Sequence, residues 1–369
     1  MSSGFCAMHK QRCWRYTGAA VTPLRGAPAR AMQGCYHRGL PAPARMAAPG
    51  TNKDVNRTAQ ATSMLAFYAD HFVLPLPPGH RFPMRKYSML RDAVAAQVPG
   101  LRLVEAPRAG DDALLLAHTP GYVQAASAGT LDAARQREIG FPWSEAMVER
   151  SRRSAGATIE ACRTALREGI AVNLAGGTHH AYADKGGGFC VFNDAAIAAR
   201  VLQRDGAVRR VAVVDLDVHQ GNGTASILQG DPSVFTLSLH GEKNYPFRKE
   251  ASDLDVGLPD GCDDDTYAQA LQAALDTLFS RFDPELIIYL AGADPHEGDR
   301  LGRLRLTLAG LARRDRLVFD AAHARQLPVA VAMAGGYGNQ IEDTVAVHAQ
   351  TVSLAAQYHA RHAQALLAT

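Results

Sequence analysis

The sequence predicts an α/β protein, an open three-layer fold in which helices cover both faces of a mostly parallel β-sheet. Short apolar runs such as 211–214 and 329–333 have the length and β-branched content of buried strands. Longer segments with helical periodicity separate these runs. Because strands that alternate with helices form βαβ units, the sheet is expected to be parallel and buried on both faces.

The first half of the fold begins with a strand at Met64. A proline-rich segment at residues 75–78 precedes the first helix. Ser144 has a side chain that is favoured at a helix N-cap, and Gly206 marks the end of a helix. The predicted strands here are 64–68, 101–106 and 170–174, and the predicted helices are 82–97, 144–168 and 193–203.

The second half repeats the same alternation. The helix from Asp264 has an acid-rich first turn, which complements the helix dipole. No low-complexity linker or internal repeat divides this part of the chain, so residues 64–369 are predicted to form one domain. The predicted strands are 211–214, 234–239, 288–293 and 329–333, and the predicted helices are 264–282, 307–325 and 341–362.

Residues 1–63 differ from the rest of the chain in charge. They contain nine lysines and arginines and one acid, Asp54, which gives about +8, so the remaining residues carry about −5 of the total formal charge of +3. The segment is rich in Ala, Arg, Pro and Gly and has no clear periodicity. Three interpretations stay open: a disordered basic extension, translated sequence upstream of a true start near Met64, and an organelle-targeting peptide.

Composition excludes several classes of protein. A slightly acidic body does not suggest direct nucleic-acid binding. No apolar run approaches the ~20 residues that span a bilayer, so no membrane association is expected. The six cysteines form no Cys-x-x-Cys pair and no disulfide framework. A cytoplasmic location fits this cysteine usage best.

A metal site is predicted where the strand 211–214 ends. The chain continues as Asp215-Leu-Asp217-Val-His219, and alternation along a strand would send all three polar side chains to one side. Ligands bind at this edge of open α/β sheets. Because two carboxylates so close together repel each other, the run indicates a bound cation.

Asp294 follows another apolar strand and could join this site. One imidazole and two carboxylates, from Asp217, His219 and Asp294, match a catalytic zinc with an open position for water. Such a water has a pKa near ~7 and is a nucleophile at neutral pH. The alternative is structural: Asp217 caps a helix and His219 packs in the core.

His179 and His180 lie next to each other in a glycine-rich loop after the strand 170–174. They could be an ordinary polar turn, or a general base and acid beside the metal. Catalytic histidines need orienting partners, and Asp215 and Asn222 are available. A neutral Asn leaves its histidine less basic than an Asp does.

Tyr337, in Ala-Gly-Gly-Tyr-Gly, could donate a hydrogen bond to a developing oxyanion. Gly188 and Phe189 could wall a narrow channel, and Cys190 is interpreted as a packing cysteine rather than a nucleophile. A core tyrosine and a flexible loop are the corresponding structural interpretations.

Taken together in chain order, the motifs resemble the zinc-dependent histone deacetylase family of the arginase/deacetylase fold, most of all its class IV-like branch with bacterial relatives. The similarity covers about residues 64–360. Ile139-Gly-Phe-Pro-Trp143 and Asp299-Arg-Leu-Gly-Arg303 point to that branch, and Asn222 departs from the Asp of class I members. The motifs are Gly-Gly-Thr-His179-His180-Ala, Gly188-Phe189-Cys190, Asp215-Leu-Asp217-Val-His219-Gln-Gly-Asn222-Gly, Gly292-Ala-Asp294-Pro and Gly335-Gly-Tyr337.

The resemblance implies a role for each matched residue. It implies a sheet of about eight strands and one zinc ion on Asp217, His219 and Asp294. It implies His180 as the main general base and acid, His179 as its electrostatic partner, and Tyr337 as the oxyanion donor. Phe189 would wall an acyl-lysine channel opposite Tyr245. A structural potassium ion would lie near Asp215, Ser238 and Leu239.

The expected function is a zinc-dependent amidohydrolase, a deacetylase that removes acetyl or longer acyl groups from lysine side chains by metal-activated water. The substrate could instead be an acetylated polyamine or another small acetylated amine. Two other classes stay open: a binuclear manganese ureohydrolase and a non-catalytic acyl-group reader. His296, next to the Asp294-Pro pair, is not assigned a role, and a place at the pocket rim is one possibility.

Overall fold

The computed structural model describes residues 63–367, so the interpretations of residues 1–62 lie outside the described residues. The predicted fold class is confirmed: a single sheet of eight strands runs in the order β2-β1-β3-β8-β7-β4-β5-β6, and all its pairings are parallel. The strands are β1 (Leu65–Tyr68), β2 (Arg102–Glu105), β3 (Ile170–Asn173), β4 (Val211–Asp215), β5 (Val234–Gly241), β6 (Leu254–Leu258), β7 (Leu286–Leu290) and β8 (Val329–Ala332).

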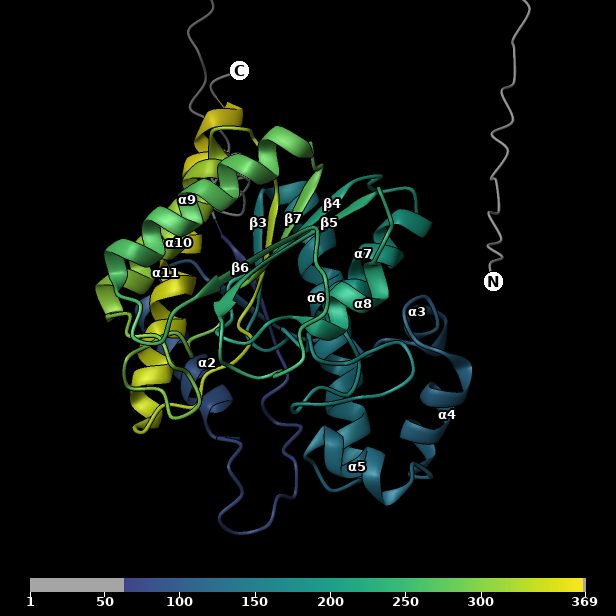
Figure 1. Cartoon of the computed structure of the whole chain (residues 1–369). Coiled ribbons are helices and arrows are strands. Elements are labelled where there is room, and N and C mark those ends of the chain that lie inside the picture. Colours follow the sequence, from purple (N-terminus) through teal and green to yellow (C-terminus); the bar gives the residue numbers. More distant parts are fainter. Residues whose placement is uncertain (1–62, 368–369) are drawn as a thin grey trace, which may run out of the picture. The chain divides into compact units, whose positions relative to one another are not determined.

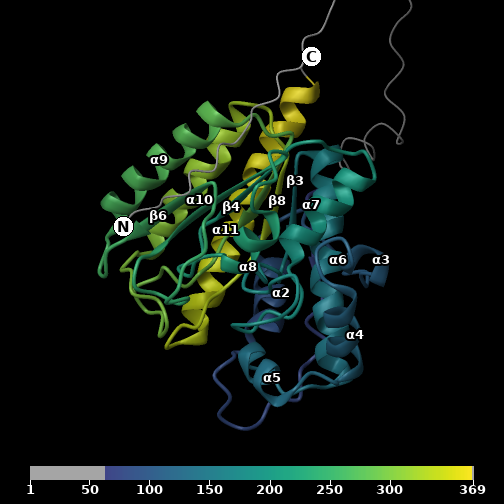
Figure 2. The same cartoon turned by 45° about the vertical axis from the view of Figure 1, so that its right-hand side comes forward.

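Helices cover both faces of the sheet (Figure 1, Figure 2). In both views α9, α10 and α11 lie on one side, and α6 and α7 lie on the other. The helices of the described residues are α2 (Lys86–Gln97), α3 (Asp111–Leu114), α4 (Pro120–Ala128), α5 (Ala133–Ile139), α6 (Glu145–Glu168), α7 (Asp194–Arg204), α8 (Asn222–Leu228), α9 (Asp264–Arg281), α10 (Leu308–His323) and α11 (Ile341–Leu367).

The sheet separates two apolar cores, and β4 contributes to both. Ala212 and Val214 pack into the core beneath α9–α11, whereas Val211 and Val213 pack into the core beneath α6 and α7. This follows from the alternation of side chains along a strand. A strand buried on both faces must be apolar at every position, which explains the continuous apolar runs in the sequence.

Several element ends differ from the prediction. The first predicted helix begins at Lys86 rather than at residue 82, because the residue before Pro83 is disfavoured in helical conformation. Ser144 is confirmed as the N-cap of α6: its hydroxyl accepts a hydrogen bond from the backbone N–H of Met147 at 3.1 Å. The edge strand β6 was not predicted, because it is short and contains Asp255 and Gly257, residue types that are depleted in strands. The short helices α3, α4, α5 and α8 were also missed.

The four strands that carry the candidate site are neighbours in the sheet. The sequence suggests that they follow one another along the chain, but β5 and β6 intervene between β4 and β7. In space the order is β3-β8-β7-β4. Parallel strands end at one edge, so the polar residues after these four strands meet there. No helix within residues 63–367 has an apolar stretch long enough to cross a membrane.

Candidate metal and catalytic centre

Asp217, His219 and Asp294 converge at the carboxyl edge of the sheet. One ligand atom from each lies within 4.8 Å of the other two, and all three residues are buried. His219 Nδ1 is 2.9 Å from Asp217 Oδ1 and 3.2 Å from Asp294 Oδ2. The strand-alternation argument for this placement is wrong, because β4 ends at Asp215. Asp217 and His219 lie in the loop that follows, and loop geometry orients them.

The charges of this cluster suit a cation. Burial, followed by the negative charge of Asp217, raises the pKa of Asp294 to about 7. Burial lowers the pKa of His219, but the neighbouring carboxylates of Asp217 and Asp294 outweigh it and raise the pKa to about 10. Asp294 Oδ2 is buried and lacks a hydrogen bond of good geometry, despite its short distance to His219. A buried carboxylate oxygen without a donor is costly, and a divalent cation would satisfy it.

Backbone amides hold both carboxylates in place. Asp217 Oδ2 accepts a hydrogen bond from the N–H of Gly335 at 2.7 Å, and Asp294 Oδ1 accepts one from the N–H of Val218 at 2.9 Å. A Cβ atom at Gly335 would lie 2.0 Å from Asp294 Oδ2 and 2.5 Å from Asp217 Oδ2. The glycine after β8 is therefore required by the close approach of the two carboxylates.

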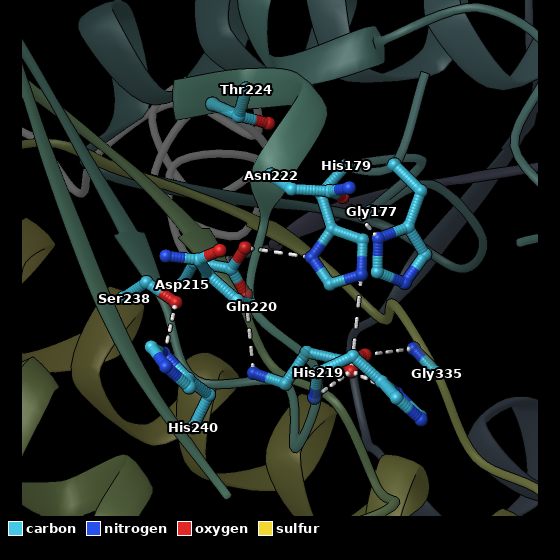
Figure 3. A network of polar contacts seen from close by, with 12 residues as sticks. Gly177, His179, Asp215, His219, Gln220, Asn222, Thr224, Ser238, His240 and Gly335 are labelled. Carbon is cyan, nitrogen blue, oxygen red and sulfur yellow. Dashed lines mark hydrogen bonds and ion pairs between the residues drawn. The ribbon is translucent and has the colours of Figure 1, made fainter. Parts of the chain in front are cut away.

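His179 is held by Asp215, as Figure 3 shows. Its Nδ1 donates to Asp215 Oδ2 at 2.7 Å, and its Nε2 lies 3.9 Å from Asp217 Oδ1. Burial lowers the pKa of His179, but the negative charges of Asp215 and Asp217 outweigh it and raise the pKa to about 9. These two carboxylates therefore favour the protonated, imidazolium form of His179.

His180 has a different partner and a different pKa. Its Nδ1 lies 2.7 Å from the side-chain oxygen of Asn222, to which it donates. Burial, followed by the positive charges of His179 and His219, lowers the pKa of His180 well below its usual value. The two adjacent histidines thus have opposite protonation preferences. Both rings are buried, but His179 is next to the carboxylates of Asp215 and Asp217, whereas His180 has a neutral Asn222 partner and the positive charges of two histidines nearby.

The backbone of Tyr337 is held by Asp299 and Arg300, two residues to which the sequence assigned no role at the site. Asp299 accepts a hydrogen bond from the backbone N–H of Tyr337 at 2.6 Å, and Arg300 Nε donates to its carbonyl at 2.9 Å. The phenol is buried. Burial and the carboxylates of Asp217 and Asp294 raise the pKa of Tyr337 well above its usual value. The hydroxyl therefore stays protonated and can donate a hydrogen bond.

A pocket of about 450 Å³ opens beside these residues. Gly188, Phe189 and Tyr245 all line it, together with His179, His180 and Tyr337. The ring of Tyr245 lies edge-on to His180 with centroids 4.9 Å apart. Gly188 has φ +52°, and a Cβ atom there would lie 2.5 Å from His180 Cδ2. Any side chain at position 188 would therefore collide with His180.

Some pocket residues gave no signal in the sequence. Phe82, in the loop before α2, and the buried Lys86, at the start of α2, both line the pocket. The Nζ of Lys86 is 3.3 Å from the carbonyl of Gly336 and 5.4 Å from the centre of the Tyr337 ring. Contacts between residues 250 positions apart depend on the tertiary fold, so no local motif could predict them.

Three further residues complete the comparison with the sequence. His296, to which the sequence assigned no role, is not among the pocket-lining residues of the described chain, and its Nδ1 accepts a hydrogen bond from the N–H of Gly298. Cys190 is buried, and burial raises the pKa of its thiol, which suits a packing role. Ser238 is the register partner of Asp215, and its hydroxyl is 3.0 Å from His240 Nδ1.

Comparison with known proteins agrees with this geometry. The family profile of the histone deacetylase domain matches residues 80–352. The chain is 48% identical over 283 residues to an uncharacterized protein of Picosynechococcus sp., a match that covers 76% of this chain and 94% of that protein. It is 34% identical to histone deacetylase 2 of Arabidopsis thaliana over 245 residues, which are 64% of this chain and 63% of that protein.

Solved structures share the fold. A histone deacetylase homologue from Aquifex aeolicus superimposes with a TM-score of 0.67 at 24% identity, covering 80% of this chain and 83% of that one. The HDA15 HD domain superimposes with the same TM-score at 23% identity, covering 82% of this chain and 95% of that one. With a family profile matched over most of its length, the chain belongs to the histone deacetylase family of hydrolases.

Proposed function

We propose that residues 64–369 form a zinc-dependent deacetylase that removes acetyl or longer acyl groups from lysine side chains. The observation that carries the proposal is the meeting of three buried metal-ligand side chains, the His179–His180 pair and the Tyr337 hydroxyl around one pocket. An amide hydrolase needs these parts: an electrophile, a proton carrier and an oxyanion donor.

Asp217, His219 and Asp294 are proposed to hold one zinc ion. One imidazole nitrogen and two carboxylate oxygens are ligands that zinc accepts, and three protein ligands leave a position open. Bound there, zinc would polarise the substrate carbonyl and lower the pKa of a water molecule. Within residues 63–367 only one group of three such ligands converges, which favours one ion over the binuclear manganese alternative.

His180 is proposed to carry the proton. Because its pKa is low, it is neutral at pH 7 and its Nε2 can accept a proton from the attacking water. The same nitrogen can then donate that proton to the departing lysine amine. His179, held charged by Asp215, supplies a positive field beside this transfer, and Asn222 fixes the His180 tautomer through its hydrogen bond at 2.7 Å.

Tyr337 is proposed to stabilise the oxyanion that forms on the amide carbonyl. Its backbone N–H is bonded to Asp299 and its backbone carbonyl to Arg300, so the residue needs little reorganisation for its hydroxyl to donate a hydrogen bond. Phe189 and Tyr245 would enclose the lysine alkyl chain between them. Such a channel orients the amide and excludes water.

We also propose a potassium site, a cytoplasmic location and a substrate class. A structural potassium ion near Asp215, Ser238 and Leu239 is supported by the pairing of Asp215 with Ser238 across β4 and β5. The cysteines of the described residues, Cys162, Cys190 and Cys262, are buried and unpaired, which suits a reducing cytoplasm. The substrate is an acyl-lysine protein or, in the alternative, a small acetylated amine. Flame photometry, cell fractionation and the substrate panel below would test these parts.

The test is a panel of amides assayed with metal-loaded protein. The panel contains peptides with acetyl-lysine and with longer acyl-lysines, acetylated polyamines and free acetyl-lysine, each with and without a chelator. The proposal predicts chelator-sensitive turnover of an acyl-lysine peptide. Binding of the peptides with no turnover of any amide would contradict it and would favour a non-catalytic acyl reader.

A further inference from the structure

Four basic side chains surround the mouth of the pocket. Arg81 precedes α2, Arg137 lies in the last turn of α5, Lys243 follows β5, and Arg303 precedes α10. All four are exposed. We call them the basic rim. Because they come from four separate segments of the chain, only the folded structure brings them together.

The basic rim is only partly neutralised. Lys243 and Arg303 share a single carboxylate, that of Asp260, at 3.8 and 3.1 Å. Arg81 and Arg137 have no ion-pair partner within the described part of the chain. Arg137 interacts with the carboxylate of Asp132 only at a distance, without an ion pair. Two of the four cations are therefore unpaired, and the other two have one carboxylate between them.

Negative charge at the mouth is scarce. Glu138 is the one exposed carboxylate among the pocket-lining residues of the described chain, and it lies 3.5 Å from the ammonium group of Lys185. Residues 64–369 as a whole carry about −5. The excess positive charge is thus a local property of the pocket mouth, on a body of the opposite sign.

We propose that the basic rim selects acyl-lysine side chains that lie in acidic peptide segments. The inference rests on the proposed deacetylase function and specifies its substrate class. When an acyl-lysine occupies the pocket, the residues on either side of it must lie over the rim. Aspartate or glutamate at these positions would be attracted to the unpaired side chains of Arg81 and Arg137, whereas lysine or arginine would be repelled.

A peptide also fits the apolar part of the mouth better than a small amine does. Phe247 and Tyr245 lie on the same loop as Lys243, and they are 87% and 41% exposed. A small acetylated amine would enter the pocket without covering Phe247. A peptide that crosses the mouth could bury this ring and bring its acidic side chains to the arginines at the same time.

The test uses three acetyl-lysine peptides that differ only in their flanking residues, which are acidic, neutral or basic. We expect kcat/KM to fall in that order, with the acidic peptide about three- to tenfold better than the neutral one at low salt. The difference should lie in KM and shrink at high salt, because screening weakens interactions between exposed charges. Fluorescence anisotropy with the same peptides measures binding independently of turnover.

Charge-reversed protein completes the design. Arg81→Glu combined with Arg137→Glu should abolish or invert the preference for the acidic peptide. Arg316→Glu is the matched control, because Arg316 is an exposed arginine on α10 that does not line the pocket, and the preference should survive in it. Equal kcat/KM for the three wild-type peptides, or better turnover of free acetyl-lysine than of any peptide, would overturn the inference. Acid-selective binding without hydrolysis would support the rim inference while contradicting the proposed function.

Discussion

Asp215 accepts a hydrogen bond from His179 at 2.7 Å, although it lies only two residues before Asp217 in the sequence. One short run therefore serves two purposes, since Asp217 belongs to the proposed metal-ligand cluster and Asp215 orients His179. We predict that Asp215→Ala lowers activity by about a hundredfold and largely retains zinc. Zinc content measured by atomic absorption, with Asp217→Ala as the comparison, checks this. Zinc loss as severe as in Asp217→Ala would refute the division.

Asn222 controls the basicity of His180, so replacing it should move the pH profile. In Asn222→Asp, the new negative charge should raise the pKa of His180, which the native site holds well below its usual value. His180 would then stay protonated to a higher pH, and its base form would be lost earlier as the pH falls.

The acid limb of the kcat/KM profile should therefore move up by about one pH unit or more. Measurement of kcat/KM from pH 5 to 9 for both proteins checks the shift. An unchanged acid limb would mean that His180 does not carry the proton.

The Tyr337 hydroxyl should matter for chemistry rather than for folding. We predict that Tyr337→Phe lowers kcat by about a hundredfold to a thousandfold, with little change in KM or metal content. Tyr267→Phe is a suitable control, because the Tyr267 hydroxyl is buried in the core beneath α9–α11 and has no hydrogen-bond partner among the described residues. Steady-state kinetics that show equal losses in the two variants would argue against an oxyanion role.

A buried ion pair lies beneath the metal cluster. Arg314 and Asp315 are both 0% exposed and form an ion pair at 2.8 Å. Arg314 also donates to the carbonyls of Gly292 and Leu216. These carbonyls belong to the segments that deliver Asp294 and Asp217, so the guanidinium ties the two metal-ligand loops to α10.

Arg314→Leu should leave Asp315 buried without its cation and lower the free energy of unfolding by about 3–5 kcal/mol. Zinc affinity should fall with it. Arg313→Leu is the neighbouring control, since Arg313 pairs with Asp265 on the surface at 2.6 Å, and its loss should cost at most about 1 kcal/mol. Denaturant titrations measure both, and equal destabilisation of the two variants would contradict this role.

The sequence predicts the centre of the site well, for a physical reason. Buried parallel strands must be apolar, so polar residues directly after them stand out and share one edge of the sheet. Asp217, His219, Asp294 and Tyr337 are all found in this way, because each follows such a strand within a few residues. The strand-alternation argument fails, because all four lie in the loops beyond β4, β7 and β8, and loop geometry orients them.

Supporting contacts could not be predicted, because they join residues far apart in the chain. Asp299 and Arg300 hold Tyr337, and Lys86 lies behind it, yet none of the three belongs to a motif with an evident local purpose. The basic rim is a further example. Its cations come from four segments, and a charge count over the whole body gives the opposite sign.

The central claim is that one zinc ion on Asp217, His219 and Asp294 supports amide hydrolysis. The most direct measurement is a zinc titration of metal-stripped protein, followed by turnover of an acetyl-lysine peptide. The account predicts no turnover without metal and a linear rise to a plateau at one zinc per chain, with no rise in Asp294→Ala. Full turnover by the stripped protein, or a plateau at two ions per chain, would contradict it.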